Sequence, residues 1–134
     1  MIERVPVERR ICLDDYAGFV PLAVAVGELR SRARELVPRI AGRRVWMVSS
    51  TAAGGGVAEM LPQLISILRE LGVTVEWVVI RPREPEFFVL TKRLHNLIHG
   101  VGDPRLGASD HTLYRTVSRQ CAEELAQLID RDDL

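Results

Sequence analysis

Apolar residues recur at helical spacing in four stretches of the chain, with charged residues between them. This pattern predicts helices over residues 22–40, 57–71 and 86–99, and a last helix that carries apolar positions from Leu113 to Ile129. Gly42, Gly72 and Gly100 follow the first three, as is typical of helix ends. We expect Pro62 to distort the early turns of the second helix, and Ser109 and Asp110 to cap the last.

Two apolar runs, Val45–Val48 and Val73–Ile80, predict strands, and the second has the composition of a parallel strand covered on both faces. Strand, glycine-rich loop, helix and strand in this order predict an α/β fold, a partial Rossmann-like domain with a short parallel sheet flanked by helices. Two strands are few for such a sheet, so we expect one truncated domain over residues 1–134, or a sheet completed by other copies. Residues 1–12 are expected to form a flexible arm, and Asp14 and Asp15 to cap the segment after it.

The amino-acid composition limits the kinds of molecule that this protein is expected to bind. The 134 residues carry 18 basic and 18 acidic side chains, a net charge of zero that argues against coating nucleic acid or an anionic membrane. No stretch approaches the roughly 20 apolar residues of a membrane span, and the N-terminus is unlike a secretory signal. Cys12 and Cys121 are far apart and lack metal-ligand spacing. We therefore expect a cytoplasmic protein with reduced thiols and no bound metal.

The candidate chemistry lies in the glycine-rich segment Ser49–Gly56, between the first strand and the second helix. Glycines there let backbone N–H groups approach an anion, and the helix N-terminus adds partial positive charge. A phosphate-binding P-loop is excluded, because no Gly-Lys-Ser/Thr follows. Two alternatives stay open. The first is an NADP site, which Arg81 after the second strand favours, although Glu59 replaces the small residue of the dinucleotide fingerprint. The second is a turn that only reverses the direction of the chain.

Three blocks carry a family resemblance. The segment Val48–Leu61, the block Glu86-Phe87-Phe88 with Thr91-Lys92 and His95-Asn96, and the early Leu13–Tyr16 occur in order and at suitable distances. Together they resemble the GT-B retaining glycosyltransferases of the family 4 type that include trehalose synthases (glycosyltransferring) and trehalose phosphorylases. The resemblance covers roughly residues 13–100 and extends loosely into the last helix.

The resemblance implies two Rossmann-like domains with a cleft between them. The N-terminal one shapes the acceptor site, and the C-terminal one, absent from these residues, holds a nucleoside-diphosphate glucose as co-substrate; neither a cofactor nor a metal is implied. A sugar or sugar nucleotide is the implied partner. The substrate- and phosphate-binding residues implied are Gly54, Gly55, Gly56, Val57, Glu59, Lys92, His95 and Asn96. No catalytic residue is assigned. Ser49, Ala53 and His99 depart from the family's usual residues, which points to a different acceptor.

Structural roles compete with these assignments. Glu59 also suits a helix cap or an ion pair, Lys92 a solvated surface, and His95 a solvated or helix-capping position. His99 and His111 are given no role, and the aromatic residues Trp46, Trp77, Phe87 and Phe88 are expected in the core.

We therefore predict the acceptor-side portion of a nucleotide-sugar-dependent glycosyltransferase, inactive alone. The alternatives are a standalone, non-enzymatic module for oligomerisation or sugar binding, and a protein that binds a nucleotide cofactor. An apolar face left uncovered by missing strands predicts a homo-oligomer.

Overall fold

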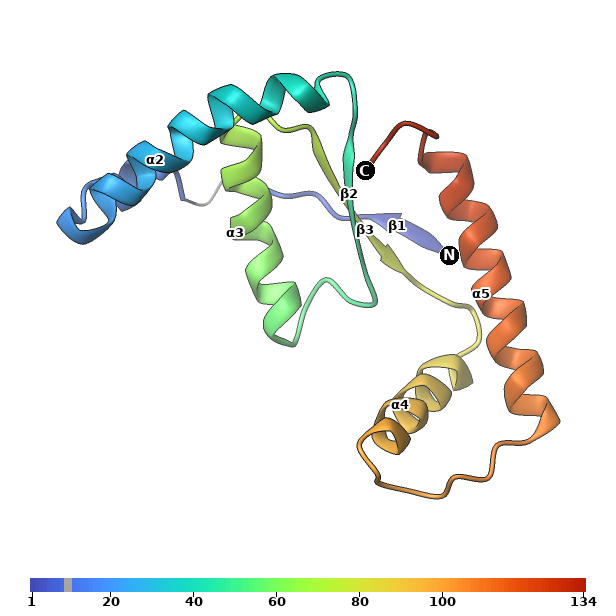
Figure 1. Cartoon of the computed structure of the whole chain (residues 1–134). Coiled ribbons are helices and arrows are strands. Elements are labelled where there is room, and N and C mark those ends of the chain that lie inside the picture. Colours follow the sequence, from blue (N-terminus) through green and yellow to red (C-terminus); the bar gives the residue numbers. More distant parts are fainter. Residues whose placement is uncertain (9–10) are drawn as a thin grey trace. The chain divides into compact units, whose positions relative to one another are not determined.

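The computed structural model describes residues 1–8 and 11–134. The chain divides into two compact units, which are described separately. The sheet unit comprises Glu3–Val79 and Asp130–Leu134, and the helical unit comprises Met1–Ile2 and Ile80–Ile129. In chain order (Figure 1) the elements are β1 (Ile2–Arg4), α1 (Leu13–Ala17), α2 (Val20–Leu36), the 3-10 helix η1 (Val37–Ile40), β2 (Val45–Ser49), α3 (Gly56–Glu70), β3 (Val75–Ile80), α4 (Glu86–Ile98) and α5 (Ala108–Leu128).

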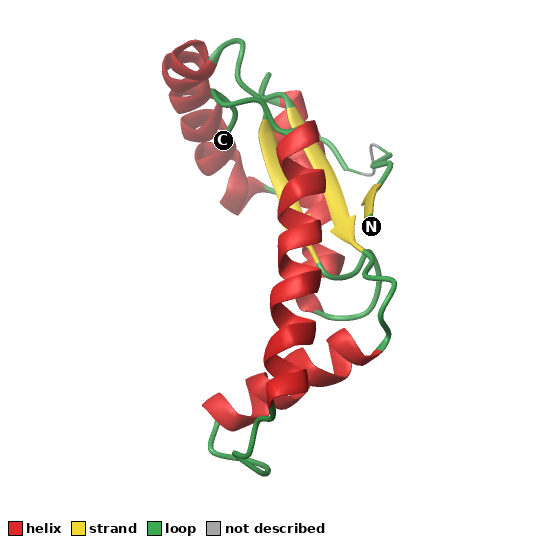
Figure 2. Cartoon of the chain, turned by 90° about the vertical axis from the view of Figure 1, so that its right-hand side faces the viewer, coloured by secondary structure: helices red, strands yellow, loops and turns green. Residues whose placement is uncertain are grey.

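The sheet has the strand order β1-β3-β2. β2 and β3 run parallel, with Val45 opposite Val75 and Ser49 opposite Val79, and Figure 2 shows two strands side by side. α3 connects them, as a parallel pair requires a crossover. The predicted α/β class is confirmed, as is the parallel pair.

The core of the sheet unit lies between α3 and one face of β3. Leu61 and Ile65 of α3 pack against every second residue of β3, Val75, Trp77 and Val79, because alternate side chains of a strand point to the same face. Trp46 and Trp77 are buried, with 8% and 2% of their surface exposed, as predicted. α3 continues through Pro62.

The start of the chain differs from the prediction. Instead of beginning a flexible arm, Ile2–Arg4 forms the strand β1 beside β3. The Val5 N–H donates to the carbonyl oxygen of Trp77 at 2.9 Å, and Val5 and Val7 pack on the core. The partner strand is distant in sequence, so local pattern does not reveal the pairing. Arg9 and Arg10, also within the predicted arm, lie outside the described residues.

Asp15 acts as a cap, as predicted for this pair of aspartates. Its carboxylate accepts the Cys12 N–H at 2.8 Å, at the beginning of α1. Asp14 instead pairs with Arg30 at 2.7 Å. The single helix predicted over residues 22–40 corresponds to two consecutive elements, the α-helix α2 and the 3-10 helix η1.

The helical unit packs α4 on α5 through Phe87, Val117 and Cys121. Phe87 is core, as predicted, whereas Phe88 is 40% exposed, because the next residue of a helix points about 100° away. Asp110 belongs to the first turn of α5, and its carboxylate accepts the Gly107 N–H at 2.9 Å. The predicted cap is thus made from the third helical residue, and Gly107 occupies the N-cap position itself.

Candidate functional site

The glycine-rich loop leaves the carboxyl end of β2, the end of a parallel sheet where ligands bind in α/β folds. A chain of hydrogen bonds ties its first residues to the core. The buried Trp77 donates its Nε1–H to Ser49 Oγ at 2.9 Å, and Ser49 Oγ donates to the Thr51 carbonyl oxygen at 2.9 Å. The indole therefore positions the start of the loop through Ser49, one of the residues that depart from the family pattern.

Thr51 organises the next turn of the loop. Its hydroxyl donates to the Ala53 carbonyl oxygen at 2.6 Å and accepts the Ala53 N–H at 3.1 Å. A hydroxyl that bonds the backbone two residues ahead replaces a backbone turn. The loop therefore holds its shape through hydrogen bonds of its own.

Gly54 and Gly55 require glycine for conformational reasons. Their φ angles are +74° and +104°, in the region that L side chains rarely adopt. A Cβ added at Gly54, Gly55 or Gly56 would meet no atom within 4 Å. The space beside this backbone is therefore open, and the cost of a side chain here comes from the backbone conformation alone.

The N-terminus of α3 follows at once. Gly55 is the N-cap residue, no side chain caps it, and the Glu59 N–H donates to the Gly55 carbonyl oxygen at 3.2 Å. The earlier N–H groups of a helix have no partner within it, so those of Gly56 and Val57 are available at the positive end of the dipole. Val57 is 65% exposed. An anion or a sugar oxygen is the complement of such a group.

Glu59 lies in this first turn with its side chain exposed. A carboxylate at this position is favoured by the helix dipole, which is the structural alternative to binding an acceptor hydroxyl. The position suits both roles.

The other predicted residues lie on α4 in the helical unit. Lys92 and His95 are exposed and Asn96 is half-buried, and their spacing of three and four residues places them on neighbouring positions of one face. The His95 ring contacts the His99 ring edge-on, with centroids 4.6 Å apart. The backbone carbonyl of Asn96 accepts the N–H groups of His99 and Val101, at 3.1 and 2.9 Å. This face therefore offers donors and acceptors on side chains, close to the helix end.

The structure thus places the eight predicted residues in two groups. Gly54, Gly55, Gly56, Val57 and Glu59 are adjacent in the sheet unit, and Lys92, His95 and Asn96 are adjacent in the helical unit. Each group is coherent by itself. The first presents backbone groups and the Glu59 carboxylate, and the second presents polar side chains.

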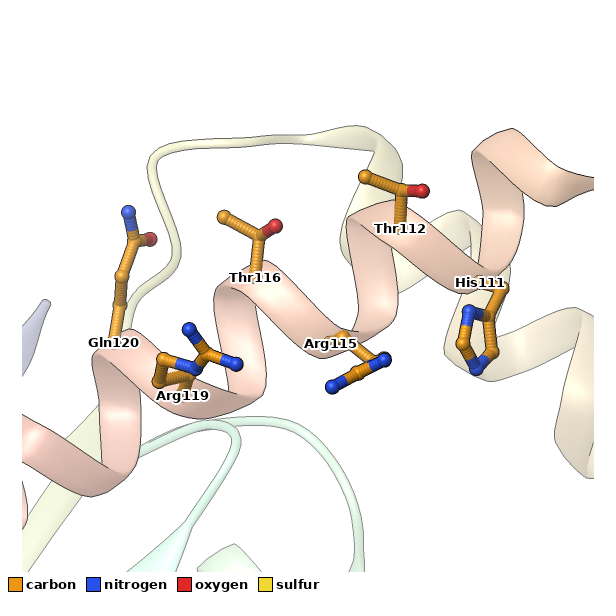
Figure 3. Close-up of a pocket in the computed structure, with 6 residues that line it drawn as sticks. All are labelled: His111, Thr112, Arg115, Thr116, Arg119 and Gln120. Carbon is orange, nitrogen blue, oxygen red and sulfur yellow. The ribbon is translucent and has the colours of Figure 1, made fainter.

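One polar surface was not predicted from the sequence. A hollow of about 450 Å³ on α5 is lined by His111, Thr112, Arg115, Thr116, Arg119 and Gln120 (Figure 3). The figure shows these side chains projecting from successive turns of the one helix. Two rows with a spacing of four residues, 111-115-119 and 112-116-120, are the sequence signal that could have indicated it.

The Cys121 thiol is not activated in this arrangement. Cys121 is buried, and burial, followed by the charge of Glu124, raises the pKa of its thiol. A raised pKa keeps the thiol protonated and weakly nucleophilic at neutral pH. Cys12 Sγ contacts the carboxylate of Asp15 at 3.1 Å. Cys121 thus packs in the core of the helical unit, and Cys12 contacts the capping residue Asp15.

A metal site or a membrane-spanning helix would each limit the functions that this protein can have. Over residues 1–8 and 11–134, no cluster of three or more His, Cys, Asp or Glu side chains is placed to hold a metal ion. In the same part of the chain, none of the helices combines the length and the hydropathy of a membrane span.

Comparison with known proteins identifies the domain type. A family model described as the N-terminal domain of trehalose synthase matches residues 47–134. The trehalose synthase of Rubrobacter xylanophilus is 40% identical over 127 residues, which cover 95% of this chain and 29% of that protein. That of Pyrococcus horikoshii is 38% identical over 109 residues, 81% of this chain and 25% of that protein. A trehalose phosphorylase of Pleurotus pulmonarius is 44% identical over 63 residues, 47% of this chain and 8% of that protein. The chain therefore spans less than a third of the length of these relatives.

Proposed function

This chain belongs to the family of trehalose synthase N-terminal domains, and we propose from this that it forms the acceptor side of a nucleotide-sugar-dependent glycosyltransferase site. The reaction is transfer of a glucosyl group from a nucleoside-diphosphate glucose to a sugar. The nucleotide of the donor requires a second domain, so the chain alone is expected to bind ligand weakly and to show no turnover. The uncapped N-terminus of α3, behind the left-handed pair Gly54 and Gly55, is the observation that supports this proposal best.

The backbone of the loop would act on the phosphate of the leaving group. When the bond between the glucosyl carbon and the phosphate oxygen breaks, negative charge develops on the phosphate. N–H groups that already point at this charge stabilise it without reorganising. Gly55, Gly56 and Val57 supply such groups, and the hydrogen bonds of Ser49 and Thr51 hold the loop in place.

The side chains would bind sugar hydroxyls. Each hydroxyl both donates and accepts hydrogen bonds, and His95 and Asn96 offer both functions. Lys92 donates only, so it suits a phosphate or a hydroxyl oxygen. The Glu59 carboxylate accepts only and would accept a hydrogen bond from a hydroxyl. We assign these contacts to the acceptor or to the transferred glucose.

Calorimetric titration tests the proposal. The chain is titrated with glucose, trehalose, UDP-glucose, ADP-glucose and NADP. We expect heat from a sugar or a sugar nucleotide, and loss of this heat in Gly55→Val, because a β-branched residue cannot hold φ near +104°. Binding of NADP alone would instead support a nucleotide-cofactor protein.

Gly42→Val provides a matched control. Gly42 has a φ of +84°, also with no atom within 4 Å of an added Cβ, but it lies before β2, away from the loop. Both variants should lose about 1–2 kcal/mol of stability from the left-handed backbone. Only Gly55→Val should lose ligand binding. An equal loss of binding in both variants would be explained by general destabilisation, and it would contradict the proposal that the loop binds the ligand.

A standalone module for oligomerisation or sugar binding is the second candidate. Exposed apolar side chains around the start of α2 favour it, since Phe19, Val20 and Val24 are 60%, 83% and 72% exposed. Such a patch promotes association. Light scattering of the purified chain should then give a homodimer or larger assembly. A monodisperse monomer would count against an oligomerisation module and against a homo-oligomer.

A further inference from the structure

The last turn of α4 carries two histidines whose side chains form a pair. His95 lies in this turn, and His99 is the C-cap residue that follows it. Both side chains are exposed, and their rings meet edge-on with centroids 4.6 Å apart. Because side chains four residues apart lie on one face of a helix, one turn from each other, both rings project from the same patch of surface.

The backbone fixes the spacing of the two rings. The His99 N–H donates to the carbonyl oxygens of His95 and Asn96, at 3.4 and 3.1 Å. Neither imidazole has a hydrogen-bond or ion-pair partner in the part of the chain that the structure describes. Their nitrogen lone pairs therefore give up no existing contact when a ligand binds.

The separation of the rings suits one metal ion. A histidine nitrogen binds Zn²⁺ at about 2.0–2.1 Å, so two nitrogens bound to the same ion lie roughly 3 Å apart. Rings with centroids 4.6 Å apart reach this arrangement by rotation about the side-chain bonds, without movement of the helix. The two histidines are thus placed as the two arms of a chelate.

The charges around this pair also suit a cation. The C-terminal end of a helix is the negative end of its dipole, and both histidines lie there. Arg93 is paired with the Asp110 carboxylate, at 3.5 Å. Lys92 is exposed, three residues before His95, and its long side chain keeps the ammonium group in solvent. The helix end therefore favours a bound cation.

We propose that His95 and His99 form a two-histidine chelate for a divalent transition-metal ion of the Cu²⁺, Ni²⁺ or Zn²⁺ type. Imidazole is a preferred ligand of these ions, whereas Mg²⁺ and Ca²⁺ prefer oxygen. Over the described residues, no third His, Cys, Asp or Glu side chain joins the pair, so water completes the coordination. A site with two protein ligands is open and exchangeable, unlike a structural zinc site with four.

The chelate gives the ion influence over sugar binding. His95 is one of the side chains that we assign to sugar hydroxyls, and a ring nitrogen that binds a metal no longer accepts a hydrogen bond. The ion therefore weakens sugar binding. This consequence rests on the proposed function, whereas the metal site rests on the histidine pair alone.

Calorimetric titration of the untagged chain with Cu²⁺, Ni²⁺, Zn²⁺ and Mg²⁺ tests the site. We expect one ion bound per chain, with the highest affinity for Cu²⁺ and no binding of Mg²⁺. NMR with Zn²⁺ locates the ion, since the imidazole signals of His95 and His99 should shift together. Zn²⁺ binding that leaves both signals unchanged would overturn the proposal.

Single variants test the chelate. His95→Ala and His99→Ala should each lower the Zn²⁺ affinity about 100-fold, because binding to the second ring is intramolecular. His111→Ala is the matched control, since it removes the third histidine, which is exposed on α5, and leaves the pair intact. Full affinity in His99→Ala would overturn the proposal, because one ring would then account for the binding.

Double variants test the spacing. His99→Ala combined with Thr91→His again places two histidines four residues apart on α4, and the Zn²⁺ affinity should return. His99→Ala combined with Asn96→His places them next to each other, on different faces, and the affinity should stay low. Equal Zn²⁺ affinity in these two double variants, whether high or low, would contradict a chelate set by the helical spacing.

Sugar titration in the presence of Zn²⁺ separates the two proposals. Saturating Zn²⁺ should weaken the binding of sugar by the chain and leave His99→Ala unaffected. Zn²⁺ binding by the pair with no effect on sugar binding would contradict the assignment of His95 to the sugar, and the metal site would stand. Loss of sugar binding with no Zn²⁺ bound at the pair would contradict the metal site.

Discussion

The two groups of candidate residues differ in what they present. The loop from Ser49 to Gly56 presents backbone N–H groups, and three of its bonds join Ser49 and Thr51 to the loop backbone at 2.6 to 3.1 Å. The face of α4 presents the side chains of Lys92, His95 and Asn96, and the His95 ring contacts the His99 ring edge-on. The loop is preorganised by local bonds, whereas the helix face keeps rotamer freedom.

This difference suits two tasks. Charge that develops during bond cleavage is stabilised best by dipoles that do not have to move. Recognition of a sugar tolerates side chains that adjust, at a cost in ordering entropy of about 0.5–1.5 kcal/mol for each. We therefore expect variants in the loop to alter both structure and binding, and variants on α4 to alter binding alone.

The largest effect is expected where the loop is anchored to the core. Trp77→Phe removes the indole donor to Ser49 from a residue with 2% exposure and should destabilise the chain by about 1–3 kcal/mol. Amide exchange at residues 51–55 should accelerate as the loop loosens. Trp46→Phe is the matched control, because its indole bonds Asp133 instead. If both variants loosened the loop equally, the anchor would not act through Ser49.

A smaller effect is expected on α4. His95→Ala should change stability by less than about 0.5 kcal/mol, since the side chain is exposed. Its affinity for sugar in titration should nevertheless fall about tenfold, the weight of one good hydrogen bond. His99→Ala removes the contacting ring and serves as the control, with affinity retained. A loss of stability in His95→Ala, as large as that of Trp77→Phe, would erase the distinction between the two regions.

The smallest effect on stability is expected when the pH is lowered. A hydrogen bond from Trp46, aided by the Arg44 and Asp130 N–H groups and the charge of Arg44, holds the pKa of Asp133 below its ordinary value. A group with a lowered pKa in the folded state adds stability at neutral pH, which is lost as pH falls through that lowered value. The hydrogen bonds of Ser49, Thr51 and Trp77 involve no ionisable group.

Acid titration followed by NMR should therefore separate the two ends of β2. The Trp46 amide and indole signals should shift as Asp133 is protonated, in the acid range below the usual aspartate pKa, while the amides of residues 51–55 stay unchanged. Simultaneous shifts at both ends would show that the loop depends on the Asp133 contacts.

Much of the fold was predictable because its signals are local. The apolar runs of β2 and β3 and the helical periodicity of α3, α4 and α5 lie within single elements. The candidate loop was predictable for the same reason, since three successive glycines after a strand are visible in the sequence. The face of α4 followed from a family resemblance rather than from a pattern.

The remaining features depend on residues far apart in the chain. β1 becomes a strand because it pairs with the distant β3, next to which the Val5 N–H donates to the Trp77 carbonyl oxygen. Phe88 is exposed because α5 packs on Phe87 beside it. Leu134 bonds the backbone of Arg44 and Trp46, and the Asp133 carboxylate bonds the same two residues.

By itself, then, the sequence determined which segments become helices and strands, where the glycine-rich loop lies and which family the chain resembles. Local periodicity and backbone preference carry this information within a few residues. The tertiary structure decided which strand lies at the edge, what holds the loop in shape and where the chain's last residue pairs. Those outcomes depend on hydrogen bonds between distant residues, whose formation requires the packed core to bring the partners together.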